Sequence, residues 1–286
     1  MRKKLVLLAS VLLMGLGSGH AGRLVTDSLQ SQVLGAVRHY NVYLPNGYEK
    51  ETDRQYPVLY LLHGLSDTHT GWEKNGRMKI VIDELIGSGE CVPMIVIMPE
   101  AGGQPTSTVW NGYFNMEGWP YERFFFEEFL PHVEKKYRII GDKEHRAVSG
   151  LSMGGGGSVV YCQRHPEMFS SCYALSGWLD QAVSDEMRKN TTSKHAIVSC
   201  SVHDHSAIEF LRKADDATKQ KLRTVRWFID CGDDDFLLEF NEDFHREMRR
   251  AGIPCEFRVR NGVHNWEYWH TGLRWSLPFV SRNFGK

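Results

Sequence analysis

Two short, almost wholly apolar segments constrain the fold of this chain more than any other feature. Residues 56–63 read Tyr-Pro-Val-Leu-Tyr-Leu-Leu-His, and residues 94–98 read Met-Ile-Val-Ile-Met. Such runs are typical of strands buried on both faces of a parallel sheet, because a strand with one wet face alternates apolar and polar residues. Both runs end at turn residues, Gly64 and Pro99. The sequence therefore predicts a sheet with both faces covered.

Helical segments alternate with further strand-like segments along the chain. Residues 122–137 place apolar side chains at helical spacing, and Pro131 within them predicts a kink or a late start. Residues 238–251 form a second amphipathic segment, which Gly252 is expected to cap. This alternation predicts an α/β fold with a mostly parallel sheet covered by helices on both faces. The more polar stretch 177–223 is expected to be an insertion over the sheet edge. The other strand-like segments are 38–44, 145–149, 172–175, 225–231 and 257–260.

The first 21 residues differ from the rest of the chain. Three basic residues, Arg2, Lys3 and Lys4, precede an apolar run of about a dozen residues, and small residues lead to a cleavage-like position after Ala21. This pattern predicts a signal peptide over 1–21 and a secreted or periplasmic protein, with residues 22–286 forming a single domain. An uncleaved N-terminal anchor is the alternative. No later segment is long and apolar enough to predict a membrane span.

The pentapeptide Gly-Leu-Ser-Met-Gly at 150–154 matches G-x-S-x-G, the pattern of a nucleophile elbow. In such an elbow the serine lies on a tight turn between a strand and a helix, and side chains two residues away would clash. A strand-like segment precedes this pentapeptide and a run of glycines follows it. We therefore predict that Ser152 is a nucleophile, with a purely structural glycine-rich turn as the alternative.

A serine hydroxyl becomes an effective nucleophile only beside a base, usually a histidine oriented by a carboxylate. After a nucleophile elbow, the acid and then the histidine follow in the sequence. A predicted strand runs directly into Asp233, Asp234 and Asp235, of which Asp235 is preferred and Asp234 is second. His264 lies after the last predicted strand and is the expected base, whereas His270 falls inside the following helix.

Ester hydrolysis through such a serine also needs two backbone N–H groups that stabilise an oxyanion. The residue after the nucleophile, Met153, is expected to supply one of them. The loop after the strand at 56–63 is expected to supply the other from Leu65, because Gly64 lets this loop approach closely.

Four separated segments together resemble the esterase D family of α/β-hydrolases. This family includes feruloyl esterases, acetyl-xylan and tributyrin-type esterases, S-formylglutathione hydrolase and the mycolyltransferases of the antigen 85 group. The resemblance implies the α/β-hydrolase fold, a triad of Ser152, Asp235 and His264, and oxyanion donors at Leu65 and Met153. The segments lie at 56–64, 150–155, 231–236 and 262–266, within a resemblance that spans about residues 37–279.

The acid motif of that family has a glycine, two residues, an aspartate and then a Phe-Leu pair. Gly232, Asp235, Phe236 and Leu237 match it, which supports Asp235 over its neighbours. One segment departs from the family pattern, because the polar insertion around 190–208 aligns with no subfamily.

The resemblance implies an exported serine carboxylesterase that acts through an acyl-enzyme without a cofactor. Its expected substrate is a small-molecule or carbohydrate-linked ester, in particular a feruloyl or acetyl ester of plant polysaccharide. One alternative is an S-formylglutathione hydrolase-like thioesterase, although the export signal argues against a cytoplasmic substrate. The other is a catalytically inactive binding protein, against which the complete triad argues. The net charge of −1 gives no sign of nucleic-acid binding.

Three weaker features complete the sequence analysis. The six cysteines have no zinc-site spacing and are expected to be mostly structural. His203 and His205 resemble a metal-binding pair but have no evident further ligands, so no metal site is predicted. An aromatic stretch is a candidate for lining a pocket, although packing in the core explains it equally well. Its members are Trp110, Tyr113, Phe114 and Trp119.

Overall fold

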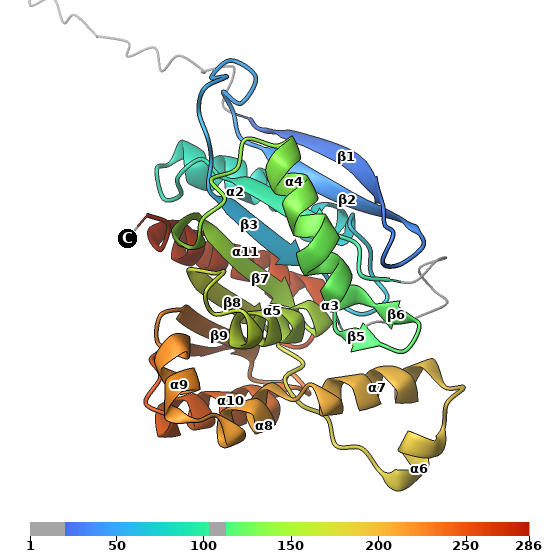
Figure 1. Cartoon of the computed structure of the whole chain (residues 1–286). Coiled ribbons are helices and arrows are strands. Elements are labelled where there is room, and N and C mark those ends of the chain that lie inside the picture. Colours follow the sequence, from blue (N-terminus) through green and yellow to red (C-terminus); the bar gives the residue numbers. More distant parts are fainter. Residues whose placement is uncertain (1–20, 103–112, 286) are drawn as a thin grey trace, which may run out of the picture.

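The computed structural model describes residues 21–102 and 113–285, and its centre is one twisted sheet of eight strands (Figure 1). The strands are β1 (Arg23–Gln30), β2 (Val37–Leu44), β3 (Val58–Leu62), β4 (Ile95–Pro99), β7 (Arg146–Leu151), β8 (Ser171–Leu175), β9 (Arg226–Gly232) and β10 (Cys255–Arg260). They lie in the order β1-β2-β4-β3-β7-β8-β9-β10. Only β2 runs antiparallel to its neighbours, β1 and β4. The predicted mostly parallel sheet is therefore confirmed.

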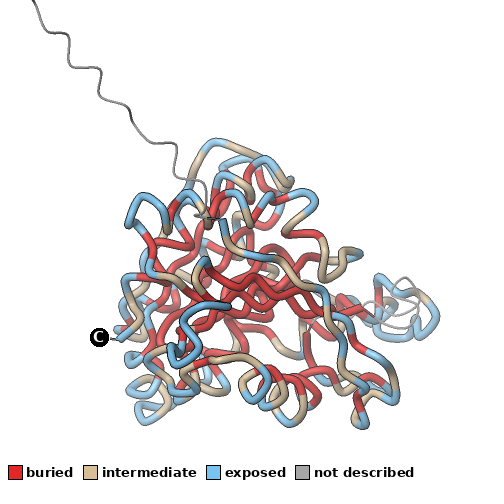
Figure 2. The backbone as a smooth tube through the Cα atoms, turned by 90° about the horizontal axis from the view of Figure 1, so that it is seen from above, coloured by how far each residue is buried: buried red, intermediate tan, exposed pale blue. Residues whose placement is uncertain are grey.

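The central strands are buried on both faces, as their apolar sequences predicted. Every residue of β3, β4 and β8 is buried. Successive side chains of β3 enter two different cores, because Leu59 and Leu61 belong to one cluster and Tyr60 and Leu62 to the other. Figure 2 shows the buried residues grouped in the centre of the molecule.

Helices cover both faces of the sheet. Val81 of α2 and Leu273 of α11 pack in the core cluster on one face, and Val160 of α5 and Met248 of α10 pack in the cluster on the other. The helices outside the insertion are α1 (Gly71–Lys74), α2 (Met78–Gly87), α3 (Tyr121–Phe124), α4 (Leu130–Lys136), α5 (Met153–Arg164), α10 (Leu238–Arg250) and α11 (Trp266–Arg282), with the 3-10 turn η2 (Lys143–His145).

The helical segment around Pro131 does not start late. It begins with α3, and the π-helical turn η1 (Phe125–Phe129) joins α3 to α4. Within this turn the Leu130 N–H donates to the Phe125 carbonyl five residues earlier. Pro131 has no N–H to continue the α-helical pattern, so the wider turn lies where the expected irregularity was predicted.

The stretch 177–223, which was expected to be an insertion over the sheet edge, is helical despite its polar sequence. It contains four short helices between β8 and β9. Ser184, Ser193, Ser206 and Asp215 each accept a backbone N–H at the start of one of them, which explains why polar sequence forms helix here. The helix α8 packs against α5 and α10, whereas α6 and α7 project beyond the sheet (Figure 1). The helices are α6 (Asp185–Lys189), α7 (Lys194–Asp204), α8 (Ala207–Lys213) and α9 (Asp216–Leu222).

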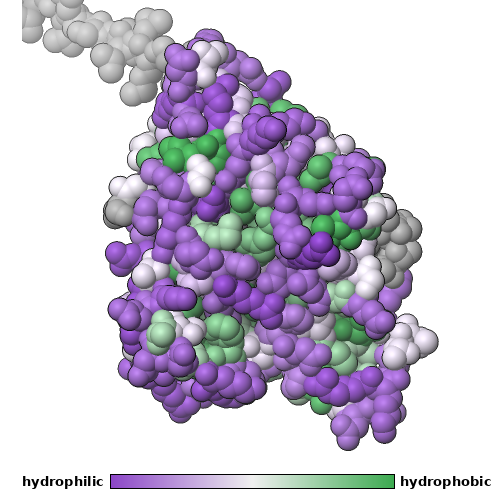
Figure 3. All heavy atoms as spheres, in the orientation of Figure 1, coloured by the Kyte–Doolittle hydropathy of each residue, from purple (hydrophilic) through white to green (hydrophobic). Residues whose placement is uncertain are grey.

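Two further elements were not predicted from the sequence. The strand β1 extends the sheet beyond β2, and a small hairpin is formed by β5 (Asn115–Met116) and β6 (Trp119–Pro120). The face seen in Figure 3 is mostly hydrophilic, with hydrophobic residues in small separate patches. Among the described residues, no helix has the length and apolar character needed to cross a bilayer.

Candidate active site

Ser152 lies on the turn between β7 and α5, in the position expected of a nucleophile elbow. Its backbone is in a strained conformation with φ 53° and ψ −118°, which places a non-glycine residue at positive φ. The neighbouring glycines are required sterically. A Cβ at Gly150 would lie 2.4 Å from the Gly154 carbonyl oxygen, and a Cβ at Gly154 would lie 2.5 Å from the Leu62 carbonyl oxygen.

The three residues predicted to form a triad meet at this turn. The Nε2 atom of His264 lies 2.9 Å from Ser152 Oγ. On the other side of the ring, Nδ1 lies 2.9 Å from Oδ2 and 3.0 Å from Oδ1 of Asp235. This geometry places a proton on Nδ1, because only a donor there can satisfy the carboxylate. The Nε2 atom is then left to accept the serine hydroxyl.

Asp235 is the one aspartate of its run that faces His264. Its side chain is fully buried, and Oδ1 also accepts the Leu237 N–H at 2.9 Å. Burial raises the pKa of Asp235, but hydrogen bonds from His264, the Leu237 N–H and the Ser176 hydroxyl outweigh it and lower the pKa below its ordinary value. Asp235 is therefore a carboxylate at neutral pH.

The two preceding aspartates lie elsewhere. Asp233 accepts the Gly262 N–H at 2.8 Å and so links the loop after β9 to the loop that carries His264. Asp234 is exposed, and its backbone N–H donates to the Gly262 carbonyl. The sequence preference for Asp235 over Asp234 therefore agrees with the geometry.

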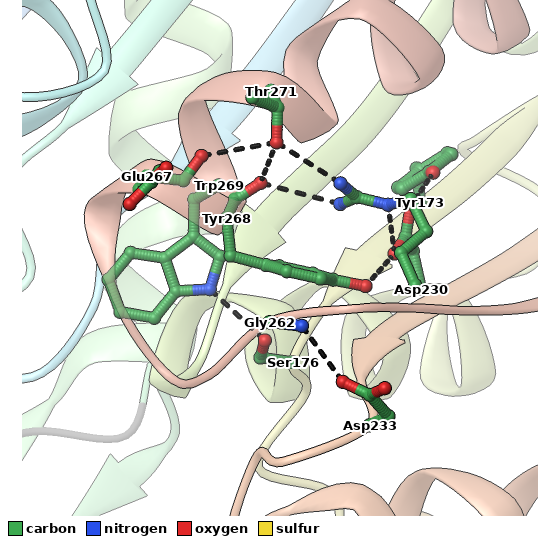
Figure 4. A network of polar contacts seen from close by, with 10 residues as sticks. Tyr173, Ser176, Asp230, Asp233, Gly262, Glu267, Tyr268, Trp269 and Thr271 are labelled. Atoms are coloured by element: carbon green, nitrogen blue, oxygen red, sulfur yellow. Dashed lines mark hydrogen bonds and ion pairs between the residues drawn. The ribbon is translucent and has the colours of Figure 1, made fainter.

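A buried polar network connects the elements on both sides of the loop that carries His264 (Figure 4). Its centre is Asp230, a fully buried residue at the end of β9 that accepts the hydroxyls of Tyr173 and Tyr268. Arg260 neutralises this carboxylate through Nε at 3.0 Å, and its guanidinium also lies 3.8 Å from the Tyr268 ring centroid. The network joins β8, β9, β10 and α11, so the ends of the loop are fixed to the sheet.

The residues predicted as oxyanion donors, Met153 and Leu65, lie in segments next to Ser152. Met153 is the first residue of α5, so its backbone N–H has no acceptor within that helix and can donate to a bound group. The loop of Leu65 approaches closely because Gly64 has no side chain, and a Cβ there would lie 3.6 Å from Ser152 Cβ. This loop is held by Tyr113, whose hydroxyl accepts the His63 N–H at 2.8 Å and donates to the His63 carbonyl.

A pocket of about 570 Å³ opens over Ser152 and His264. This size is usual for a small-molecule site. Most of its wall is apolar, and five of its side chains are aromatic. The other lining residues are Gly64, Leu65, Asp67, Leu151, Trp178, Gln181, His195, Phe236, Leu237, Phe240, Trp266 and Trp269.

The aromatic stretch that was a candidate for this wall lies elsewhere. Tyr113 and Phe114 are buried in the core, and Trp119 packs against the Arg38 guanidinium, 5.2 Å from the ring centroid. Trp110 lies outside the described residues. Sequence reasoning missed the five aromatic residues of the wall. Phe236 and Trp266 directly follow the Asp235 and His264 motifs, so closeness to those motifs was a usable signal, whereas nothing marked Trp178.

Both histidines of the metal-like pair bind backbone carbonyls. His203 Nδ1 lies 2.7 Å from the Gln181 carbonyl oxygen, and His205 Nδ1 lies 2.7 Å from that of Ser201. The His205 ring also stacks on Phe114. No group of side chains suited to a metal ion occurs among the residues that the structure describes. All six cysteines are free thiols, and four of them are buried.

Several known proteins that resemble this chain in sequence or fold are named as esterases. A family model described as "Putative esterase" matches residues 31–279. The solved structure of a ferulic acid esterase is 50% identical and superposes with a TM-score of 0.87, covering 93% of this chain and 100% of that one. An endo-1,4-beta-xylanase/feruloyl esterase from Xylanibacter ruminicola is 31% identical over 201 residues, which are 69% of this chain and 27% of that protein. The matched region is therefore about a quarter of this relative's length.

A more distant structure shows how widely the fold is shared. An S-formylglutathione hydrolase from Agrobacterium tumefaciens is 20% identical, with a TM-score of 0.74 over 94% of this chain and 98% of that one. At this identity the likeness concerns the fold alone. The predicted α/β-hydrolase fold is confirmed by these structures together with the strand order. From the family model and the ferulic acid esterase structure, it follows that this chain is a member of the Esterase family.

Proposed function

We propose that this protein is an exported serine carboxylesterase that hydrolyses a feruloyl or acetyl ester of plant polysaccharide. The observation that carries the proposal is the hydrogen-bonded series from Asp235 through His264 to Ser152, at the base of an aromatic pocket. A buried carboxylate, a histidine and a serine in this order are the groups that acyl transfer requires.

In the proposed reaction, Ser152 Oγ attacks the ester carbonyl carbon while His264 Nε2 takes the hydroxyl proton. The N–H groups of Leu65 and Met153 donate to the oxyanion that forms. His264 then gives the proton to the departing alcohol oxygen as the ester C–O bond breaks, leaving an acyl-enzyme. Water, deprotonated by His264, attacks the carbonyl carbon of this intermediate. The bond from that carbon to Ser152 Oγ then breaks, His264 returns the proton to Oγ, and the carboxylic acid is released. Asp235 holds the Nδ1 proton throughout and stabilises the charged ring.

The aromatic lining of the pocket favours a planar, apolar acyl group. Trp178, Phe240 and Trp269 contribute aromatic surface to its wall, and aromatic rings prefer to pack on one another with offset or edge-to-face geometry. A feruloyl group presents such a ring, and an acetyl group would leave most of the wall uncovered. The 50% identity with a ferulic acid esterase supports the same preference.

Export is part of the proposal, and the start of β1 fits it. The Gly22 N–H donates to Asp83 Oδ1 at 2.7 Å, and this carboxylate also binds the Tyr43 hydroxyl and Lys79. Cleavage after Ala21 would turn this N–H into a charged α-amino group, which strengthens a hydrogen bond to a carboxylate. A side chain at position 22 would meet the Tyr43 ring at 2.5 Å, so a glycine suits the new terminus.

Two measurements test the proposal. The first is the rate of hydrolysis of methyl ferulate, p-nitrophenyl acetate and S-formylglutathione by the wild-type protein and by Ser152→Ala. We expect methyl ferulate to be the best of the three by kcat/KM and Ser152→Ala to be inactive. A preference for S-formylglutathione would contradict the assigned substrate class. The second is N-terminal sequencing of the protein recovered outside the cytoplasm, where a terminus other than Gly22 would contradict the cleavage site.

A further inference from the structure

The residues of the pocket divide into a buried base and an exposed rim. At the base, beside Ser152, Leu151 is 1% exposed and Trp269 is 7% exposed. At the rim, Phe236 is 74% exposed, and His195 is also exposed. Phe236 is the most exposed of the large hydrophobic side chains in the described part of the chain. A phenylalanine held this far into solvent, at the mouth of a pocket, is a surface that a ligand can cover.

Phe236 lies beside the group that transfers the proton. Its ring centroid is 4.4 Å from that of His264, and its backbone continues directly from Asp235. A molecule resting on Phe236 would therefore lie beside the His264 ring. In the proposed mechanism this ring gives a proton to the departing alcohol.

His195 reaches the same rim from the insertion that matched no subfamily. It lies in the first turn of α7, whose start is fixed by the Ser193 hydroxyl. Its ring nitrogens have no hydrogen-bond partner within residues 21–102 and 113–285. Because they do not serve the fold, these nitrogens can donate to and accept from a ligand.

Hydrogen bonds connect the insertion to the wall of the pocket. His203 of α7 binds the Gln181 carbonyl oxygen at 2.7 Å. The Gln181 side chain in turn accepts the Trp178 Nε1–H at 2.9 Å. Trp178, Gln181 and His195 all line the pocket. The insertion therefore holds polar groups at the mouth of a wall that is otherwise mostly apolar.

We propose that Phe236, His195 and Gln181 form a subsite for the sugar on the alcohol side of the ester. This inference rests on the proposed function. When a short acyl group is attached to a polysaccharide, the acyl group can enter a closed pocket, whereas the polymer must remain outside. The exposed rim is therefore the part of the site that meets the sugar. An aromatic ring suits the apolar C–H face of a sugar, and imidazole and amide groups suit its hydroxyls.

The subsite has a kinetic signature because the sugar leaves when the acyl-enzyme forms. Residues that touch only the sugar change the rate up to that point and cannot change hydrolysis of the acyl-enzyme. Two esters with the same acid and different alcohols pass through the same intermediate. The ratio of their kcat/KM values therefore isolates the contribution of the alcohol.

The experiment compares a feruloyl ester of arabinose with methyl ferulate. The variants are His195→Ala and Phe236→Ala. The matched control is Ile197→Ala, because Ile197 is an exposed residue of α7, the helix that carries His195, and is not part of this pocket wall. We expect the ratio of kcat/KM, sugar ester over methyl ester, to fall about tenfold in each rim variant, as for the loss of one good contact. It should stay at the wild-type value in Ile197→Ala. Rapid mixing should show one rate of acyl-enzyme hydrolysis for both esters in every variant.

The outcomes separate the two proposals. An unchanged ratio in both rim variants, with methyl ferulate still hydrolysed, would overturn the sugar subsite and leave the proposed function standing. An equal fall in Ile197→Ala would also overturn it, because the effect would then come from disturbing α7. A wild-type protein that hydrolyses neither ferulate would instead contradict the proposed function.

Discussion

Replacing Asp235 by asparagine should remove nearly all activity while leaving the size and shape of the side chain unchanged. The carboxylate has two oxygens, and both lie within 3.0 Å of His264 Nδ1. Oδ1 also accepts the Leu237 N–H at 2.9 Å. An asparagine has one oxygen for these partners, and satisfying Leu237 with it turns the amide NH₂ group toward Nδ1.

Two donors cannot face each other across 2.9 Å in a buried site without a large cost. The imidazole avoids this by placing its proton on Nε2 and accepting the amide at Nδ1. Nε2 then points an N–H at Ser152 Oγ and can no longer accept the serine proton. A wrong tautomer of this kind costs a serine enzyme about 10⁴-fold in kcat, which is roughly 5.5 kcal/mol of transition-state stabilisation.

The assay is kcat/KM for p-nitrophenyl acetate, with thermal unfolding as the control for folding. The two neighbouring aspartates provide matched variants. In Asp233→Asn the amide oxygen can still accept the Gly262 N–H, and Asp234 is exposed, so both variants should keep activity within a few-fold of wild type. Similar losses in all three variants would refute the tautomer argument, as would an Asp235→Asn variant with more than about 1% of wild-type activity.

Three further predictions follow from the site and the sheet. Ser152→Ala should lower kcat by about 10⁴- to 10⁶-fold with an unchanged Tm, and a residual rate above a tenth of wild type would exclude Ser152 as nucleophile. Gly154→Ala should reduce both the Tm and the activity, because its Cβ would lie 2.5 Å from a backbone oxygen in β3, and a fully active, equally stable variant would contradict the elbow geometry. Burial raises the pKa of Asp27, but hydrogen bonds led by that from Lys136 outweigh it and lower the pKa to about 2. Asp27 therefore contributes stability above pH ~4 that is lost as the pH falls toward 2. In Asp27→Asn, the free energy of unfolding measured with urea should change less between pH ~4 and pH ~2 than it does in the wild type. An unaltered pH dependence would count against this contribution.

The geometry of the proposed triad was predictable because each of its residues is marked by a local requirement. The turn at Ser152 forces glycines at 150 and 154, since a Cβ at either position would enter the backbone. His264 follows the last strand of the sheet, where the fold leaves few histidines to choose from. The three adjacent aspartates are chemically alike, and the direction of each side chain, which only the folded structure shows, distinguishes Asp235 from its neighbours.

The pocket wall could not be predicted in the same way, because its residues share no local pattern. They come from the end of β7, from the loops after β3, β8, β9 and β10, and from α7, α10 and α11, and these segments meet only when the sheet has formed. Apolar side chains in such loops look the same in sequence whether they fill a core or line a cavity. Tyr113 and Trp178 illustrate this ambiguity, since the first holds the oxyanion loop from the core and the second faces the pocket. The residues of the proposed triad thus lie in short sequence motifs, whereas the residues of the pocket wall lie in segments that share no motif. The insertion carrying His195 matches no subfamily pattern and supplies polar groups to the rim of the pocket, so we expect it to contribute to the preference for the alcohol.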